Sequence, residues 1–306
     1  MIFLLLALLL LAPQDVKHDT PAVPVKGSIR VDVDLTTVDV SVLTVDGRFV
    51  TGLGPGHFRV FEDKIEQEII YFSSDDAPVS VGIVFDASAS MKNKMGGSKQ
   101  ALMEFVKTSN PLDEFFLVSF SDTAQLVEPF TSSPEELETK LLTVEGQGQT
   151  AMFDGLYLAL AELRMAKYGR RALIIISDGG ENHSRYSYSY IKSASRECSC
   201  QIYAIGLFNP VSDRPTVEER YGPIVLEDIV EATGGRGFSV KEPKDFTDIA
   251  RAISLTLRNE YVLGYHSSNH ARDGRWRKIK VKTQGIPKKI PPLVLRVKSG
   301  YYGATQ

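Results

Sequence analysis

The sequence contains only two cysteines among 306 residues, Cys198 and Cys200, in the short segment ECSCQ. A single closely spaced pair supports neither a zinc site nor a disulfide framework. A bridge across one intervening residue would be strained, so we interpret the two as separate thiols at a helix–strand junction. The sequence leaves open whether they pair.

No apolar run in the sequence is long enough to suggest a membrane span. The run Ile2–Ala12 has eleven residues, about 16 Å as a helix, which is about half of a bilayer core. Its length suits the core of a signal peptide, although no Lys or Arg precedes it and Pro13 follows Ala12. We therefore expect a signal peptide over 1–14, a linker over 15–27, and export to an extracytoplasmic location, periplasmic or secreted.

A strong net charge and the common catalytic motifs are also missing. The formal net charge is −3, which gives no general reason to expect a nucleic-acid partner. No HExxH, GxSxG or Walker A pattern occurs. Between His270 and Gly300, however, ten Lys or Arg accompany one acid, and between Ser28 and Ala77 ten acids accompany four bases. A basic patch can bind nucleic acid or membrane, but we prefer the interpretation that these segments are neighbours in one sheet.

Both ends of the chain show the alternation typical of half-buried strands. The first such segment is 28–77, with a hairpin turn at Asp46-Gly47, and the second is 259–303. The apolar alternation changes phase near Thr36-Thr37, which predicts a bulge or bend there. Neither segment is long enough to close a sandwich alone, so we expect one all-β, sandwich-like domain built from both.

The middle of the chain, 78–258, alternates strands and helices. Continuous aliphatic runs at Val79–Phe85, Phe115–Phe120 and Ala172–Ile176 are typical of buried parallel strands. Helical patterns lie between them. We therefore predict an α/β fold with a doubly wound, mainly parallel, Rossmann-like sheet, inserted in the all-β domain.

Polar oxygen-bearing side chains follow these predicted strands. Asp86, Ser88 and Ser90 come directly after the first strand, Thr150 follows a Gly-rich loop, and Asp178 follows the Ala172–Ile176 strand. Ligands of open α/β sheets bind just beyond the carboxyl ends of the strands. Carboxylate and hydroxyl oxygens suit hard cations. The sequence thus predicts a divalent-metal site, and we also expect Thr150 to cap the helix that follows it.

This pattern resembles the metal-ion-dependent adhesion site (MIDAS) of von Willebrand factor type A (VWA) domains. All five ligand positions of that family are present over the resembling region 79–258: Asp86, Ser88, Ser90, Thr150 and Asp178. The flanking segments Phe61–Ser88 and Glu260–Lys282 are similar to the bacterial, VWFA-related acidobacterial group. One departure is Ala89, where many members have Gly, so the loop is expected to be slightly altered without losing a ligand.

The resemblance implies a bound Mg²⁺, or Mn²⁺ or Ca²⁺, held directly by the hydroxyls and through water by at least one Asp. Neutral hydroxyls leave the cation under-neutralised, so it would take a carboxylate from a partner protein presenting Asp or Glu. Asp154 has two open interpretations: orienting a metal-bound water or loop amide, or a first-turn acid that suits the helix dipole.

The leading hypothesis is thus an exported adhesion-like binding module and not an enzyme. Two alternatives remain. One is a scaffold in which the metal is purely structural. The other is a Mg²⁺-dependent phosphatase of the haloacid dehalogenase type, which SDGGEN superficially fits, although Ser88 stands where that chemistry needs a second acid.

Overall fold

The computed structural model describes residues 35–208, 217–240, 245–287 and 289–305. The predicted signal peptide (1–14), the linker (15–27) and the first residues of the 28–77 segment lie outside the described residues. Among the helices within those ranges, none has the length and apolarity needed to cross a membrane.

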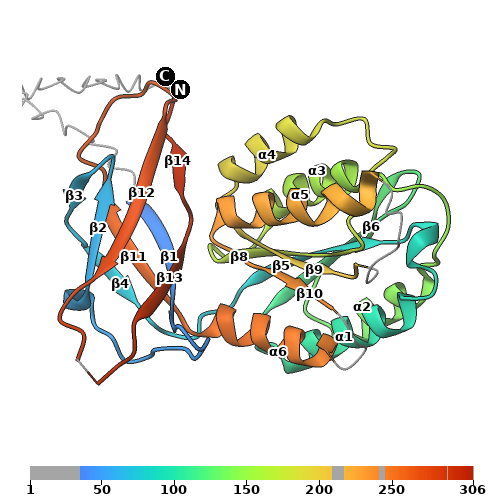
Figure 1. Cartoon of the computed structure of the whole chain (residues 1–306), viewed down its shortest axis with the longest axis horizontal. Helices are drawn as coiled ribbons and strands as arrows, with labels where there is room; N and C mark the ends of the chain where they lie inside the picture. The colour runs from blue at the N-terminus through green and yellow to red at the C-terminus, as the bar shows by residue number, and fades with distance from the viewer. Residues whose placement is uncertain (1–34, 209–216, 241–244, 288, 306) are drawn as a thin grey trace, which may run out of the picture. The chain divides into compact units, whose positions relative to one another are not determined.

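The middle of the chain forms a six-stranded sheet in the order β10-β9-β8-β5-β6-β7. Figure 1 shows this sheet between two layers of helices. All neighbouring pairs are parallel except β6 with β7. Every residue of β5 is buried, because helices cover both faces of the sheet. The strands are β5 (Ser80–Asp86), β6 (Glu114–Phe120), β7 (Ala124–Thr131), β8 (Arg171–Ser177), β9 (Gln201–Gly206) and β10 (Gly237–Ser239).

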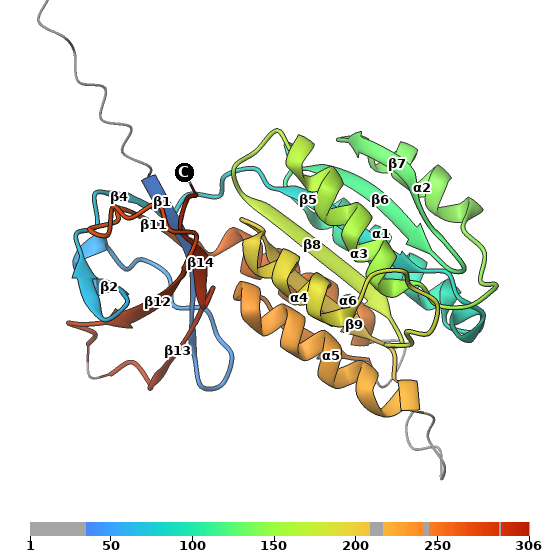
Figure 2. The same ribbon diagram turned by 90° about the horizontal axis from the view of Figure 1, so that it is seen from above.

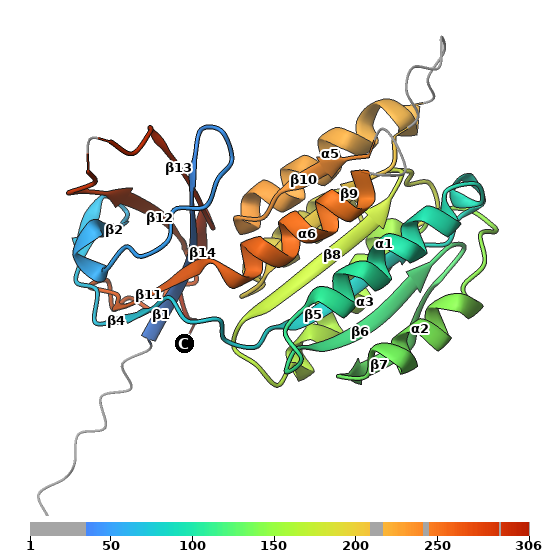
Figure 3. The same ribbon diagram turned by 90° about the horizontal axis from the view of Figure 1, so that it is seen from below.

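Among the described residues, six α-helices cover this sheet, three on each face. Side chains of α3 (Met152–Glu162), α4 (Tyr188–Glu197) and α5 (Val217–Thr233) share one core with Val84 and Phe116, and these helices lie over the sheet in Figure 2. Side chains of α1 (Met95–Thr108), α2 (Pro134–Thr143) and α6 (Asp245–Arg258) share the other core with Ile83 and Phe85. The views from the two sides show α1 and α6 on the opposite face (Figure 3).

Two four-stranded antiparallel sheets are built from both ends of the described chain, in the orders β13-β1-β11-β4 and β14-β12-β2-β3. Their inner side chains form one shared core, which makes the pair a sandwich. The predicted fold class is therefore confirmed, whereas the exact domain boundaries stay a prediction. The strands are β1 (Leu35–Thr44), β2 (Phe58–Glu62), β3 (Ile65–Gln67), β4 (Tyr71–Ser73), β11 (Glu260–His266), β12 (Trp276–Thr283), β13 (Leu293–Val297) and β14 (Gly300–Tyr302).

The oppositely charged segments are neighbours within these sheets, as predicted. Strand β12 pairs with β2, and β13 pairs with β1. Arg277 and Glu62, both nearly fully buried, approach to 3.8 Å. The predicted bulge at Thr36-Thr37 is wrong, because β1 pairs with β11 in unbroken register from Leu35 onward.

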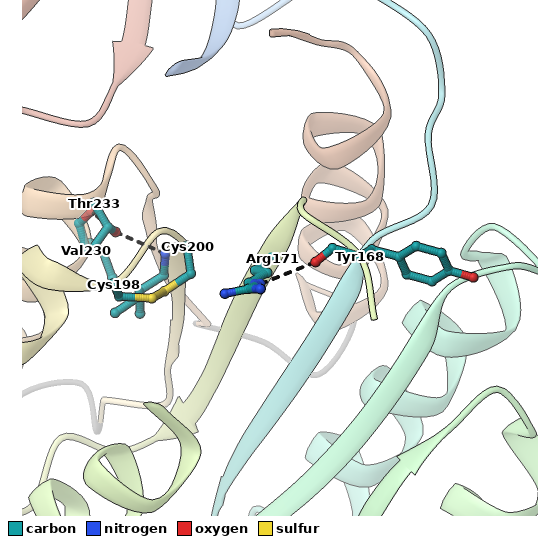
Figure 4. The surroundings of a disulfide bond; sticks show 7 residues. Tyr168, Arg171, Cys198, Cys200, Val230 and Thr233 are labelled. Atoms are coloured by element: carbon teal, nitrogen blue, oxygen red, sulfur yellow. Dashed lines mark hydrogen bonds between the residues drawn. A yellow bond between two sulfur atoms is a disulfide. The ribbon is translucent and has the colours of Figure 1, made fainter. Parts of the chain in front are cut away.

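The two cysteines are bridged, so their interpretation as separate thiols is wrong (Figure 4). Helix α4 ends at Glu197, and Cys198 and Cys200 connect it to β9. The bend at this junction brings their Cα atoms to 5.2 Å, within the usual disulfide range of about 4.4–6.8 Å.

Candidate metal site

The loop after β5 presents the first three predicted residues. Asp86 and Ser88 are buried and Ser90 is exposed, and the Ser88 and Ser90 hydroxyl oxygens lie 3.0 Å apart. Ala89 begins a 3₁₀ turn, Ala89–Met91. Among the described residues, only Asp63 and Lys64 are non-glycines with positive φ, so Ala89 does not need glycine's conformational freedom. Ala89 therefore takes a conformation open to any residue, and the expected slight alteration of the loop stays a prediction.

Asp86 is fixed by hydrogen bonds to both carboxylate oxygens. Ser177 Oγ donates to Oδ2 at 2.5 Å, and the Ser88 N–H donates to Oδ1 at 2.9 Å. Burial raises the pKa of Asp86, the Ser177 and Ser88 hydrogen bonds lower it, and the Asp178 charge raises it slightly. The net pKa is about 6. The sequence reading did not include Ser177, although a polar last residue on an aliphatic strand was a usable signal.

The loop before α3 is tied to the β5 loop through its backbone. The Ala89 N–H donates to the Gly148 carbonyl at 3.1 Å, and the Gln147 N–H donates to the Ala87 carbonyl at 2.9 Å. These bonds fix the segment directly before Thr150, whose side chain is buried. The β5 loop and the Thr150 loop therefore form one backbone unit.

Thr150 does not cap its helix, so that prediction is wrong. The N-cap of α3 is Ala151, with no side-chain cap hydrogen bond. The Phe153 N–H instead donates to Glu181 Oε2 and Ser184 Oγ, at 3.0 Å each. The Thr150 hydroxyl is thus free of the helix-capping role that would otherwise explain it.

Asp178 follows β8 and lies close to Thr150. A Cβ placed on Gly180 would lie 3.3 Å from Thr150 Oγ1 and 3.4 Å from Asp178 Oδ1, so the two oxygens face a common space. The Thr150 N–H donates to Asn182 Oδ1 at 3.0 Å, which fastens this loop to the previous one. The absence of a side chain at Gly180 leaves the space between the two oxygens open.

Asp154 lies 5% exposed in the first turn of α3 and binds another part of the β8 loop. It accepts from the Arg185 N–H at 2.9 Å, the Tyr186 N–H at 3.2 Å and the Arg185 Nε at 2.9 Å. Of the two open interpretations, this geometry favours the one in which Asp154 orients loop amides. It holds the backbone of the loop that begins with Asp178.

These five residues suit a hard divalent cation. They supply two carboxylates and three hydroxyls, all oxygen donors. Neighbouring ligands of a Mg²⁺ octahedron with bonds of about 2.1 Å are about 3.0 Å apart, which is also the separation of the Ser88 and Ser90 hydroxyls. Within the described ranges no three His, Cys, Asp or Glu residues cluster, so a site here depends on the hydroxyls.

A cation of the protein itself already lies at this position. Lys94, the N-cap residue of α1, places its Nζ 3.1 Å from Asp178 Oδ2. The sequence reading missed Lys94, because the contact joins residues 84 positions apart and no spacing pattern announces it. Asp178 thus already pairs with a positive charge of the protein itself.

Residues 81–181 match the model of the von Willebrand factor type A domain. The sheet order and the arrangement of these loops agree with this match, so this part of the chain is a VWA domain. The same family is found among solved structures: a von Willebrand factor type A protein from Catenulispora acidiphila has a TM-score of 0.51 at 13% identity. That match covers 89% of this chain and 74% of the other.

Two further proteins are similar over part of their length. An uncharacterised protein of Borreliella burgdorferi is 27% identical over 221 residues, which cover 61% of this chain and 64% of that protein. The mussel byssus protein PTMP1, in a structure described as having a zinc-occupied MIDAS motif, has a TM-score of 0.50 at 21% identity. That match covers 64% of this chain and 49% of PTMP1. At these identities the solved structures bear on the fold alone.

Proposed function

We propose that this protein is an exported binding module that holds a divalent cation and uses it to capture an acidic side chain of a partner protein. Two observations carry this proposal: the Ser88 and Ser90 hydroxyls are paired beside Asp86, and the Thr150 and Asp178 oxygens face a common space. Backbone hydrogen bonds join the loop of Ser88 and Ser90 to the loop that leads to Thr150. The comparisons support a metal-dependent interaction module of the VWA class.

The donor set explains why such a site would bind an acid. Two carboxylates would formally neutralise a divalent ion. Asp86, however, already accepts hydrogen bonds from Ser177 and Ser88, which reduces the negative charge that it offers to the ion. The remaining ligands are neutral hydroxyls. Ser90 is exposed, so the ion would be reachable from solvent at this edge of the sheet. A partner carboxylate is the oxygen ligand that best completes such a coordination sphere.

The metal is proposed only as a divalent cation. The zinc-occupied MIDAS of PTMP1 supports divalent binding in a related fold. Mg²⁺ is the first candidate because all the donors are oxygens, with Mn²⁺ or Ca²⁺ as alternatives.

A binding role fits the buried carboxylate better than phosphatase chemistry does. A nucleophilic aspartate must present a carboxylate oxygen to the substrate, as a covalent intermediate requires. Asp86 is 0% exposed and both of its oxygens accept hydrogen bonds. We therefore propose that the protein is not an enzyme.

Export is supported by the cysteine bridge in addition to the predicted signal peptide. Disulfides persist mainly in oxidising compartments outside the cytosol. The Cys198–Cys200 bridge suits such a compartment, whether periplasmic or extracellular.

The proposed function is tested with a fluorescently labelled Gly-Asp-Gly peptide whose anisotropy is followed with Mn²⁺ and with chelator. We expect saturable binding with Mn²⁺ only, no binding of the matched Gly-Asn-Gly peptide, and weaker binding by Ser90→Ala. Ser90 is exposed, so its truncation leaves the fold intact. Metal-induced stabilisation without any peptide binding would instead favour the purely structural metal site.

A further inference from the structure

Lys94 and Asp178 form an ion pair that is largely withdrawn from solvent. Their side chains are 18% and 11% exposed, and Nζ lies 3.1 Å from Oδ2. Exposed surface pairs such as Arg48–Asp46, with side chains 74% and 51% exposed, are common and weak. A pair this sheltered is screened less by water, so the charge of Lys94 acts strongly on whatever occupies the space beside Asp178.

The position of the ammonium sets up a competition. Asp178 is one of the two carboxylates available to a metal, and Lys94 already occupies one of its oxygens. A divalent ion binding here must share or displace that contact, and it meets an additional positive charge. Lys94 therefore lowers the affinity of the site for a metal alone.

The same charge has the opposite effect on an acidic partner. A carboxylate has two oxygens, and one bound to the metal leaves the second free. The Lys ammonium is a compact charge with three donors on a flexible stem, so it can turn from Asp178 to a second acceptor nearby. A partner carboxylate would also cancel the repulsion between the ammonium and the metal.

We infer that Lys94 couples metal loading to partner capture: it weakens binding of the divalent ion alone and supplies a second contact to the partner's carboxylate. The inference rests on the proposed function, and it adds the regulation of that site. Its signature is a pair of opposite effects, which a lysine that merely stabilises the fold would not produce.

The experiment is calorimetry with Mg²⁺ and then with the Gly-Asp-Gly peptide at saturating Mg²⁺, for the wild type and Lys94→Met. The variant should bind Mg²⁺ about tenfold more tightly, the effect of removing one unit charge beside a divalent ion even with water-like screening. It should bind the peptide several-fold more weakly. Lys94→Arg should stay close to the wild type in both titrations, because it keeps the charge.

Lys107→Met is the matched control. Lys107 lies in the last turn of the same helix, about 20 Å along the axis from Lys94, and pairs with the exposed Glu138. It should change neither affinity, and thermal unfolding should show that both variants fold.

The outcomes separate the two proposals. If the wild type binds Mg²⁺ and peptide but Lys94→Met shows unchanged metal affinity, or unchanged or tighter peptide binding, the role of Lys94 is refuted and the proposed function stands. If the wild type binds neither, the proposed function fails and the role of Lys94 fails with it.

Discussion

Glu260, the first residue of β11, is a buried carboxyl group whose titration should control how stability depends on pH. It is 4% exposed. Its Oε1 accepts from Ser41 Oγ at 3.1 Å and Gln201 Nε2 at 2.6 Å, and Arg170 lies 3.3 Å from Oε2. Burial, followed by the nearby Asp39 charge, raises the pKa of Glu260, and Arg170 lowers it, so that the net pKa is about 7.

The sign follows from where the proton is bound. Between pH 4.5 and pH 7 the folded protein keeps the Glu260 proton, whereas the unfolded chain has released it, so folding is favoured. This stabilisation is complete below pH 4.5 and is lost as the pH rises through 7. Each pKa unit corresponds to about 1.4 kcal/mol, which gives about 3 kcal/mol in total, most of it between pH 5 and pH 8.

The assay is urea unfolding with chelator present at pH 5 and pH 8, for the wild type and Glu260→Gln. Other carboxyl groups also titrate in this range, so the tested quantity is the difference between the two proteins. The variant should lose about 2–3 kcal/mol of the gain in stability that the wild type shows on acidification, at unchanged m-value.

Glu66→Gln is the control with the same chemical change. The hydrogen bond and charge of Arg59 lower the pKa of this exposed carboxyl, so its removal should shift the pH dependence slightly in the opposite direction. A Glu260→Gln protein with the wild-type pH dependence, or with a steeper one, would refute the reasoning.

Three further predictions concern stability. Replacing both cysteines by alanine should lower the free energy of unfolding by about 1.6 kcal/mol, which is the chain-entropy value for a three-residue loop. Urea titrations of the variant and of the oxidised wild type measure this difference. Equal stability of the two proteins would contradict it. Gly82→Ala should lower the free energy of unfolding by about 1–3 kcal/mol, because its Cβ would lie 2.2 Å from the Phe116 ring. Gly56→Ala, whose Cβ would meet open space, should lower it much less. Equal urea midpoints for the two variants would contradict this crowding. Asp154→Ala should lower the free energy of unfolding by about 1–3 kcal/mol and speed hydrogen exchange at the Arg185 and Tyr186 amides, because both donate to Asp154. Unchanged exchange at these amides would contradict the role of Asp154 in holding this loop.

The parts of the fold that could be predicted from sequence are those set by burial on both faces. The runs at Val79–Phe85 and Ala172–Ile176 became the neighbouring strands β5 and β8, because a parallel sheet covered by helices requires continuous apolar strands. Strand order then brought Asp86 and Asp178, which follow these two strands, to one edge of the sheet. Thr150 follows a helix and reaches that edge because its loop is hydrogen-bonded to the β5 loop.

The features that sequence could not predict depend on side-chain contacts across the fold. The Lys94–Asp178 pair and the Ser177–Asp86 hydrogen bond join different loops, and no periodicity reports them. The disulfide depends on the bend between α4 and β9. The predicted bulge failed because Leu35 lies on the exposed face of β1, whereas Val38, Val40 and Val42 face the core, so no change of phase is needed within the strand.

The central claim, a divalent-metal site that depends on hydroxyl ligands, is tested most directly by titrating Mg²⁺ into the metal-free wild type, Thr150→Val and Thr143→Val. Thr150→Val removes one hydroxyl at nearly constant shape, and Thr143 is an exposed threonine at the end of α2 whose hydroxyl donates to a helix carbonyl. We expect one saturable Mg²⁺ per chain in the wild type and in Thr143→Val, and loss of this binding in Thr150→Val. Saturable binding that survives unchanged in Thr150→Val, or no binding by the wild type, would contradict it.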